Sequence, residues 1–60
     1  MTWLRTPLGG YVDPLEVVVI DYDDPEHGTC FAMLRCGKDI VIDDSADRVW
    51  HAVMDARRNA

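Results

Sequence analysis

Two cysteines and two histidines are the residues of this 60-residue chain best suited to nucleophilic or metal chemistry. Cys30 and Cys36 fall on one predicted strand, and at about 3.3 Å per residue a continuous strand separates them by roughly 20 Å. A disulfide needs Cα atoms within about 7 Å, so this spacing excludes an internal bridge and joint metal ligation. We expect two reduced thiols, as is typical of the cytosol, with an intermolecular disulfide or a reactive thiol as the alternatives.

The histidines are placed no better for catalysis. His27 precedes Cys30 by three positions, and His51 falls on a predicted helix. A zinc site needs about four clustered ligands, of which His27 and Cys30 supply only two. A Cys–His nucleophilic pair also lacks a third group and an oxyanion loop. We predict no enzyme activity, no catalytic residue, no metal ligand and no cofactor, with His27 in a loop and His51 on a solvated helix face.

The segment from Asp21 to Gly28 looks superficially like a calcium-binding loop. It departs from that pattern because Glu26 stands where the sixth loop position requires glycine, and Pro25 occupies a ligand position. We therefore expect solvated turn acids that also protect a sheet edge, with weak divalent binding as the alternative.

The hydrophobic pattern predicts a single small α+β domain over residues 1–60. Its expected architecture is an antiparallel β-meander of three to four strands followed by one C-terminal amphipathic helix (ββββα), with the helix on one sheet face. Residues 11–12 are a further strand candidate after the glycine turn at 9–10. The predicted strands cover residues 2–6, 16–22, 29–36 and 39–43.

The helix is predicted to begin near Ser45, where Asp44 or Ser45 can accept the free N–H groups of the first turn. The helical phase places Trp50 in the core, whereas Trp3 is either core or an anchor for a partner. The expected apolar face consists of Ala46, Val49, Trp50, Val53, Met54 and Arg57. The expected solvated side consists of Asp47, Arg48, His51, Asp55 and Arg58.

One helix covers only one face of a small sheet, so apolar strand residues are left over. Either the sheet curls enough to shield them, or another copy or a partner buries them. We favour the second, because little of a 60-residue chain remains to cover that face. The expected partner-binding residues are Val17, Val19, Phe31, Met33 and Val41.

The charge is concentrated in the middle of the chain. The formal net charge is −5, and residues 21–47 carry eight acidic residues against two basic ones. This balance argues against direct binding to nucleic acid or to an anionic membrane. The patch either imitates nucleic-acid phosphates in a basic groove or only confers solubility. Its predicted members are Asp21, Asp23, Asp24, Glu26, Asp43, Asp44 and Asp47.

No apolar run approaches the roughly 18 residues of a membrane span. The N-terminal residues lack the basic and apolar regions of a secretory signal, so we expect a cytoplasmic protein.

The order of the turns resembles a known family. The Gly-Gly turn at 9–10, the Tyr-Val-Asp-Pro segment at 11–14 and the Gly-Lys-Asp-Ile-Val-Ile segment at 37–42 are similar to the G-x-[FY]-x-[ND]-P and G-K-x-[IVY]-V-V segments of the small FlbD-like (SwrD) flagellar proteins. The similarity spans roughly residues 9–54, and the family also resembles this chain in length. The Trp-Leu-Arg-Thr-Pro segment at 3–7 and the acidic hairpin depart from the family. The former resembles the start of small uncharacterised actinobacterial and phage proteins. The resemblance implies a cytosolic, non-enzymatic accessory protein and carries over no catalytic residue.

The sequence therefore predicts a small acidic, non-catalytic protein-interaction module of bacterial or phage origin. It is expected to act as a homodimer or on a protein partner through the apolar sheet face. The alternative is a phage-type inhibitor that occupies a basic groove of a host protein.

Overall fold

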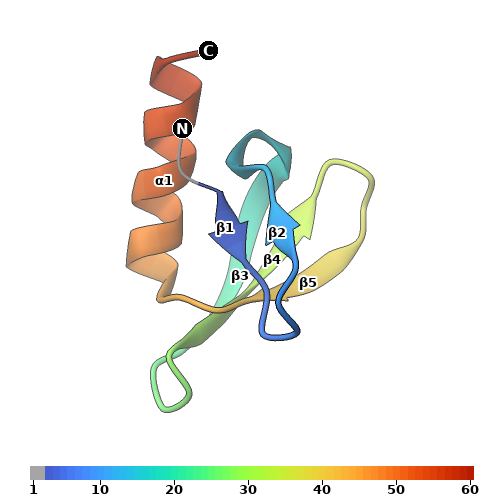
Figure 1. Ribbon diagram of the computed structural model, residues 1–60, viewed down its shortest axis with the longest axis vertical. Helices are drawn as coiled ribbons and strands as arrows, with labels where there is room; N and C mark the ends of the chain where they lie inside the picture. The colour runs from blue at the N-terminus through green and yellow to red at the C-terminus, as the bar shows by residue number, and fades with distance from the viewer. Residues whose placement is uncertain (1–2) are drawn as a thin grey trace.

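The computed structural model describes residues 3–60 and confirms an α+β arrangement of strands followed by a C-terminal helix (Figure 1). The strands form a two-stranded sheet, β1–β2, and a three-stranded sheet in the order β3-β4-β5, in place of one continuous meander. Thr2, predicted to begin the first strand, lies outside the described residues. The elements are β1 (Leu4–Arg5), β2 (Tyr11–Val12), the 3-10 helix η1 (Pro14–Glu16), β3 (Val17–Asp24), β4 (Thr29–Leu34), β5 (Asp39–Ile42) and α1 (Ala46–Arg58).

The β1–β2 hairpin is closed by a glycine turn and is tied to the larger sheet. Gly9 has a φ of 91°, a conformation that favours glycine, and the Gly10 N–H donates to Oγ1 of Thr6 over 2.9 Å. The backbone N–H of Asp43, just after β5, donates to the carbonyl of Arg5 over 2.7 Å. This bond connects β1 to the end of β5.

The 3-10 helix η1 turns the chain from β2 into β3. The Asp13 carboxylate caps it by accepting from the Leu15 N–H over 2.9 Å, and Pro14 occupies its first turn, where a missing N–H costs nothing. Arg35, just after β4, donates to this segment twice: its Nε to the Leu15 carbonyl and its backbone N–H to the Glu16 carbonyl. These bonds fix the start of β3 beside the end of β4.

Two register shifts interrupt the pairing of β3 with β4. They lie between Val17 and Val19 and between Ile20 and Tyr22, and each adds one residue to β3 relative to β4. A bulge of this kind inverts the alternation of side chains along a strand. As a result, Val17 and Ile20 pack with the core, whereas Val19 and Tyr22 are exposed.

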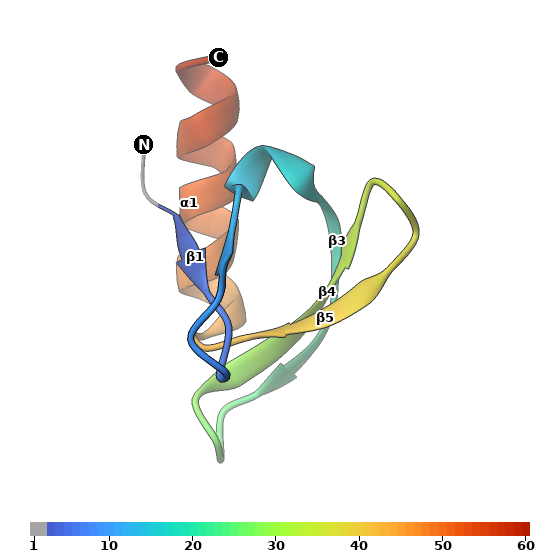
Figure 2. The same cartoon turned by 45° about the vertical axis from the view of Figure 1, so that its right-hand side comes forward.

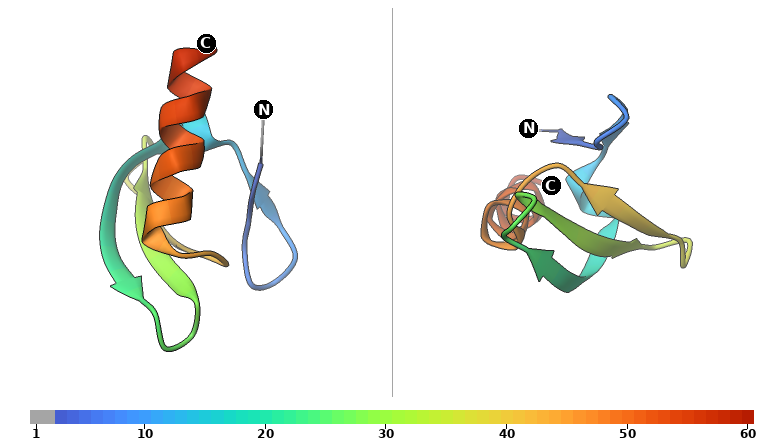
Figure 3. Two further views of the ribbon diagram at one scale, coloured as in Figure 1. Left: turned by 90° about the vertical axis from the view of Figure 1, so that its left-hand side faces the viewer. Right: turned by 90° about the horizontal axis from the view of Figure 1, so that it is seen from below.

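The core lies where α1, the β1–β2 hairpin and one face of the three-stranded sheet meet. Figures 2 and 3 show these three parts around a common interior. We call the sheet face that packs on this core the inner face and the opposite one the outer face. The buried cluster comprises Leu4, Val17, Cys30, Ala32, Ile42, Val49 and Val53.

The helix begins as predicted. Ser45 is its N-cap, with the hydroxyl accepting from the Arg48 N–H over 3.3 Å. The buried stripe is formed by Val49, Val53 and Ala56, at positions i, i+4 and i+7. The side predicted to be solvated is exposed: Asp47, Arg48, His51, Asp55 and Arg58. No helix within residues 3–60 is long and apolar enough to cross a membrane.

The prediction that Trp50 belongs to the core is wrong, since it is 41% exposed. The buried stripe of α1 is formed by Val49, Val53 and Ala56, and Trp50, one position after Val49, is turned about 100° away from it. Trp50 lies beside this stripe, with the Arg57 guanidinium over its ring at 5.5 Å. Arg57 also donates to the carbonyl of Val17 over 3.3 Å. Met54, assigned to the same face, is exposed as well, and so is Trp3.

Candidate protein-binding face

The outer face carries apolar side chains from all three strands, which we call the outer apolar face. The side chains of Val19 and Phe31 are 40% and 39% exposed, and that of Tyr22 is 59% exposed. Met33 and Val41 are half-buried. The outer apolar face consists of Val19, Tyr22, Phe31, Met33 and Val41.

Four of the five residues predicted for partner binding lie on this face, but the prediction for Val17 is wrong. Its side chain is 1% exposed and belongs to the core cluster. The first bulge of β3 is the reason, because it places Val17 on the inner face and Val19 on the outer one. Tyr22 was missed because the second bulge, between Ile20 and Tyr22, moves it to the outer face, and the residues of β3 themselves give no local signal of either bulge.

The centre of the outer apolar face is an ordered aromatic pair. Tyr22 of β3 lies directly opposite Phe31 of β4, and the rings meet edge to face with centroids 5.9 Å apart and an interplanar angle of 69°. Val41 of β5 lies opposite Phe31 on its other side. Cross-strand pairs of this kind stabilise a sheet and fix side-chain positions. A partner would therefore meet a surface that is already organised.

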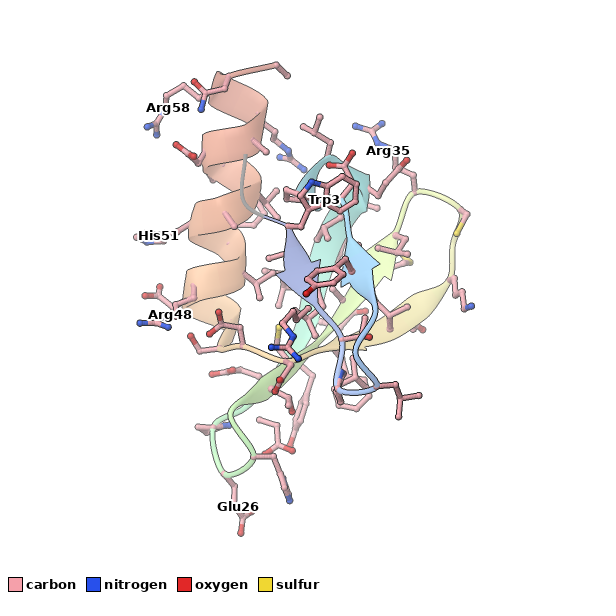
Figure 4. The ribbon with its side chains drawn as sticks, in the orientation of Figure 1. Trp3, Glu26, Arg35, Arg48, His51 and Arg58 are labelled. Carbon is pink, nitrogen blue, oxygen red and sulfur yellow. The ribbon has the colours of Figure 1, made fainter. Side chains whose placement is uncertain are left out.

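Most of the predicted acidic patch gathers at one end of the molecule, which we call the acidic end. The register aligns Asp23 with Cys30 and Cys30 with Ile42, just before Asp43. The Ala46 N–H at the start of α1 donates to Oδ1 of Asp23 over 3.1 Å. Figure 4 shows Glu26 at the tip of the β3–β4 hairpin. The acidic end comprises Asp23, Asp24, Glu26, Asp43, Asp44 and Asp47, whereas Asp21 lies on the outer face.

Few of these carboxylates are neutralised. Asp24 contacts Nδ1 of His27 at 2.8 Å, and Asp44 lies 4.0 Å from the exposed guanidinium of Arg48. The other members of the acidic end form no ion pair within residues 3–60. The repulsion that remains is reduced only by solvent and salt.

The two cysteines occupy opposite environments, and both are free. Cys30 is fully buried on the inner face, and burial, followed by the charges of Asp23 and Asp44, raises the pKa of its thiol. Because the thiolate is the nucleophile, these effects suppress its reactivity. Strand β4 ends at Leu34, so the predicted strand over 29–36 is too long and Cys36 lies exposed in the turn before β5.

His27 is grouped with carboxylates of its own loop. One ligand atom each from Asp24, Glu26 and His27 lie within 4.8 Å of one another, whereas Cys30 is not part of the group. The hydrogen bond between His27 and Asp24 joins two residues of the exposed hairpin. The imidazole of His27 therefore forms its hydrogen bond within the hairpin, to the carboxylate of Asp24.

The environment of Cys30 predicts a dependence of stability on pH. Above about pH 8.5 the unfolded thiol ionises, whereas the folded thiol, with its raised pKa, stays protonated. The unfolded state then binds fewer protons, so the free energy of unfolding falls as the pH rises and is fully retained below that range. Urea titrations at about pH 7 and about pH 9.5 should show a smaller fall for Cys30→Ala than for the wild type. The Cys36→Ala control should keep the wild-type fall, and equal falls in wild type and Cys30→Ala would contradict the prediction.

A second apolar surface, which the sequence did not indicate, follows the edge of the sheet. It is a groove between β3 and α1, with Val18 and Trp50 as its most exposed apolar residues, and Asp23 and Asp47 also line it. The extra residue of the first bulge, Val18, contributes to it. Val19 borders both this groove and the outer apolar face.

The chain was compared with protein-family models, with curated proteins and with solved structures, and none of the three comparisons gives a match.

Proposed function

We propose that this chain is a non-catalytic protein-binding module whose contact surface is the outer apolar face. The observation that carries the proposal is that three adjacent strands place five apolar side chains on a face that remains exposed, while α1 and the β1–β2 hairpin pack on the other. Burying apolar surface is worth about 25 cal/mol per Å², which favours association through this face. The partner is a second copy or another protein.

Other features agree with this proposal. The buried thiol of Cys30 has a raised pKa, and His27 is engaged at the hairpin tip, which supports a non-catalytic role. Free cysteines are usual in a reducing compartment, which supports cytoplasmic location. The resemblance to the FlbD-like flagellar family supports a bacterial or phage accessory protein.

The test compares Phe31→Ser with Leu8→Ser. Phe31 lies at the centre of the outer apolar face, whereas Leu8 is 99% exposed in the β1–β2 turn, so both variants remove an exposed apolar side chain. Light scattering over a concentration series detects self-association, and covalent cross-linking in cells detects other partners. Phe31→Ser should lose the complex that the wild type and Leu8→Ser form. A strict monomer at high concentration that also gives the same cross-linked product with Phe31→Ser would refute the proposal.

The acidic end favours a second candidate function, an inhibitor that occupies a basic groove as a nucleic-acid mimic. The contact between Asp23 and the start of α1 places the hairpin acids beside those of the helix. This function predicts affinity that falls steeply with salt and falls further in the double variant Asp43→Asn/Asp47→Asn. Salt-insensitive binding by the wild type would exclude it.

A further inference from the structure

The outer apolar face contains one hollow in which aromatic rings and carboxylates occur together. It is open, measures about 370 Å³, and is lined by Asp21 and Tyr22 of β3, Phe31 of β4 and Asp39 of β5. The edge-to-face arrangement of Tyr22 and Phe31 forms its apolar part. Among the lining residues there is no cation. We call this the aromatic–acid pocket.

The fold, rather than local sequence, brings the two carboxylates together. Asp21 is the extra residue of the second bulge of β3, which lets it line the same hollow as its neighbour Tyr22. Asp39 lies opposite Met33 and therefore diagonally across from Phe31, within reach of an aromatic side chain. Both acids are exposed, and neither has an ion-pair partner in the part of the chain that the structure describes.

An arginine side chain matches this combination. The guanidinium is planar and weakly hydrated, stacks on aromatic rings, and donates hydrogen bonds in a fork that suits carboxylates. The chain itself contains this stacking contact, between Arg57 and Trp50. We propose that the aromatic–acid pocket binds an arginine of a basic segment in another protein, with neighbouring apolar side chains of that segment on Val19 and Val41. This inference rests on the proposed function and specifies its partner.

Charge disfavours a second copy as the occupant. A two-fold symmetric dimer places the same patch of both subunits in one interface. The carboxylates of Asp21 and Asp39 would then approach those of the other copy, and each chain already carries a formal net charge of −5. Like charges in an interface oppose association, whereas a basic segment is attracted.

To test the proposal, the isotope-labelled chain is titrated with a short capped peptide of alternating arginine and leucine, and binding is monitored by NMR. Matched peptides carry glutamine or lysine in place of arginine. The amide signals of Tyr22, Phe31 and Asp39 should shift on binding. The arginine peptide should bind about tenfold more tightly than the glutamine peptide, and more tightly than the lysine peptide. Absence of binding, binding elsewhere, or an affinity for the arginine peptide no higher than that for the glutamine or the lysine peptide would overturn the proposal.

Matched double variants separate the pocket from general charge. Asp21→Asn/Asp39→Asn and Asp43→Asn/Asp47→Asn change the net charge equally, but only the first alters the pocket. The first should weaken binding of the arginine peptide by about tenfold and the second by far less. Equal losses would show attraction by net charge alone and overturn the proposal. If Phe31→Ser loses the cellular complex while Asp21→Asn/Asp39→Asn keeps it, the proposed function stands and the arginine assignment fails.

Discussion

Replacing Val17 by aspartate is expected to leave the chain unfolded, whereas Val19→Asp is expected to fold. Val17 is buried among the core residues, while Val19 is on the outer face. An unpaired carboxylate in an apolar core costs several kcal/mol even after relaxation of the protein. A core in a chain of fewer than about 70 residues supplies about 3 to 5 kcal/mol in total. The loss at Val17 is therefore comparable to the whole stability.

Far-UV circular dichroism and the dispersion of amide NMR signals distinguish the two outcomes. Val19→Asp should keep wild-type spectra, with a stability loss of about 1 kcal/mol or less, as is usual for exposed positions. The pair is matched, because the two positions are separated by a single residue and receive the same substitution. The same outcome for both variants, either folded or unfolded, would mean that β3 lacks its first bulge, because residues two positions apart in a regular strand lie on the same face.

Ile42→Ala is expected to be the most destabilising of the simple truncations in the chain. Ile42 is among the largest fully buried side chains, and it lies in β5 opposite the buried Cys30. Truncating a buried isoleucine to alanine costs about 2 to 5 kcal/mol, because the transfer free energy is lost and a cavity remains. At about 4 to 8 °C per kcal/mol for a domain of this size, Tm should fall by roughly 8 to 40 °C.

Val41→Ala is the control for Ile42→Ala. Its side chain is half-buried on the outer face, so its removal leaves no closed cavity and should cost about 1 kcal/mol or less. Thermal unfolding followed by circular dichroism measures both variants. Similar losses at the two positions would contradict the assignment of inner and outer faces in β5.

The order of the elements could be predicted because its signals are local. Ser45 begins the helix through a hydroxyl that satisfies an N–H three residues away, and glycine at position 9 marks a turn by its positive φ. Such signals depend on a few neighbouring residues. The sequence did not predict that β1 and β2 form a sheet of their own. How this sheet is placed depends on contacts between residues far apart in the chain, such as the bond from the Asp43 N–H to the Arg5 carbonyl, and no local pattern reports such contacts.

The candidate site could be predicted only where the strands alternate regularly. In β4 and β5 the simple alternation places Phe31, Met33 and Val41 correctly. In β3 it places Val19 correctly but fails for Val17 and Tyr22, because the bulges depend on how β3 fits the neighbouring strand and not on its own residues. The position of Asp21 beside Tyr22 follows from the same irregularity, so the aromatic–acid pocket was beyond the reach of an alternation pattern.

The shared core of the first strand and the last helix has a consequence for how the chain acquires its structure. Leu4 and Val53 belong to one buried cluster, so neither end of the chain can bury its apolar side chains without the other. During synthesis, the apolar side chains of β1 therefore stay exposed to solvent until the residues of α1 have left the ribosome. Folding is then expected to be a single cooperative event after translation of the helix, with no stable nascent intermediate. A truncation that removes α1 should leave the remaining strands as an unfolded chain sensitive to proteases.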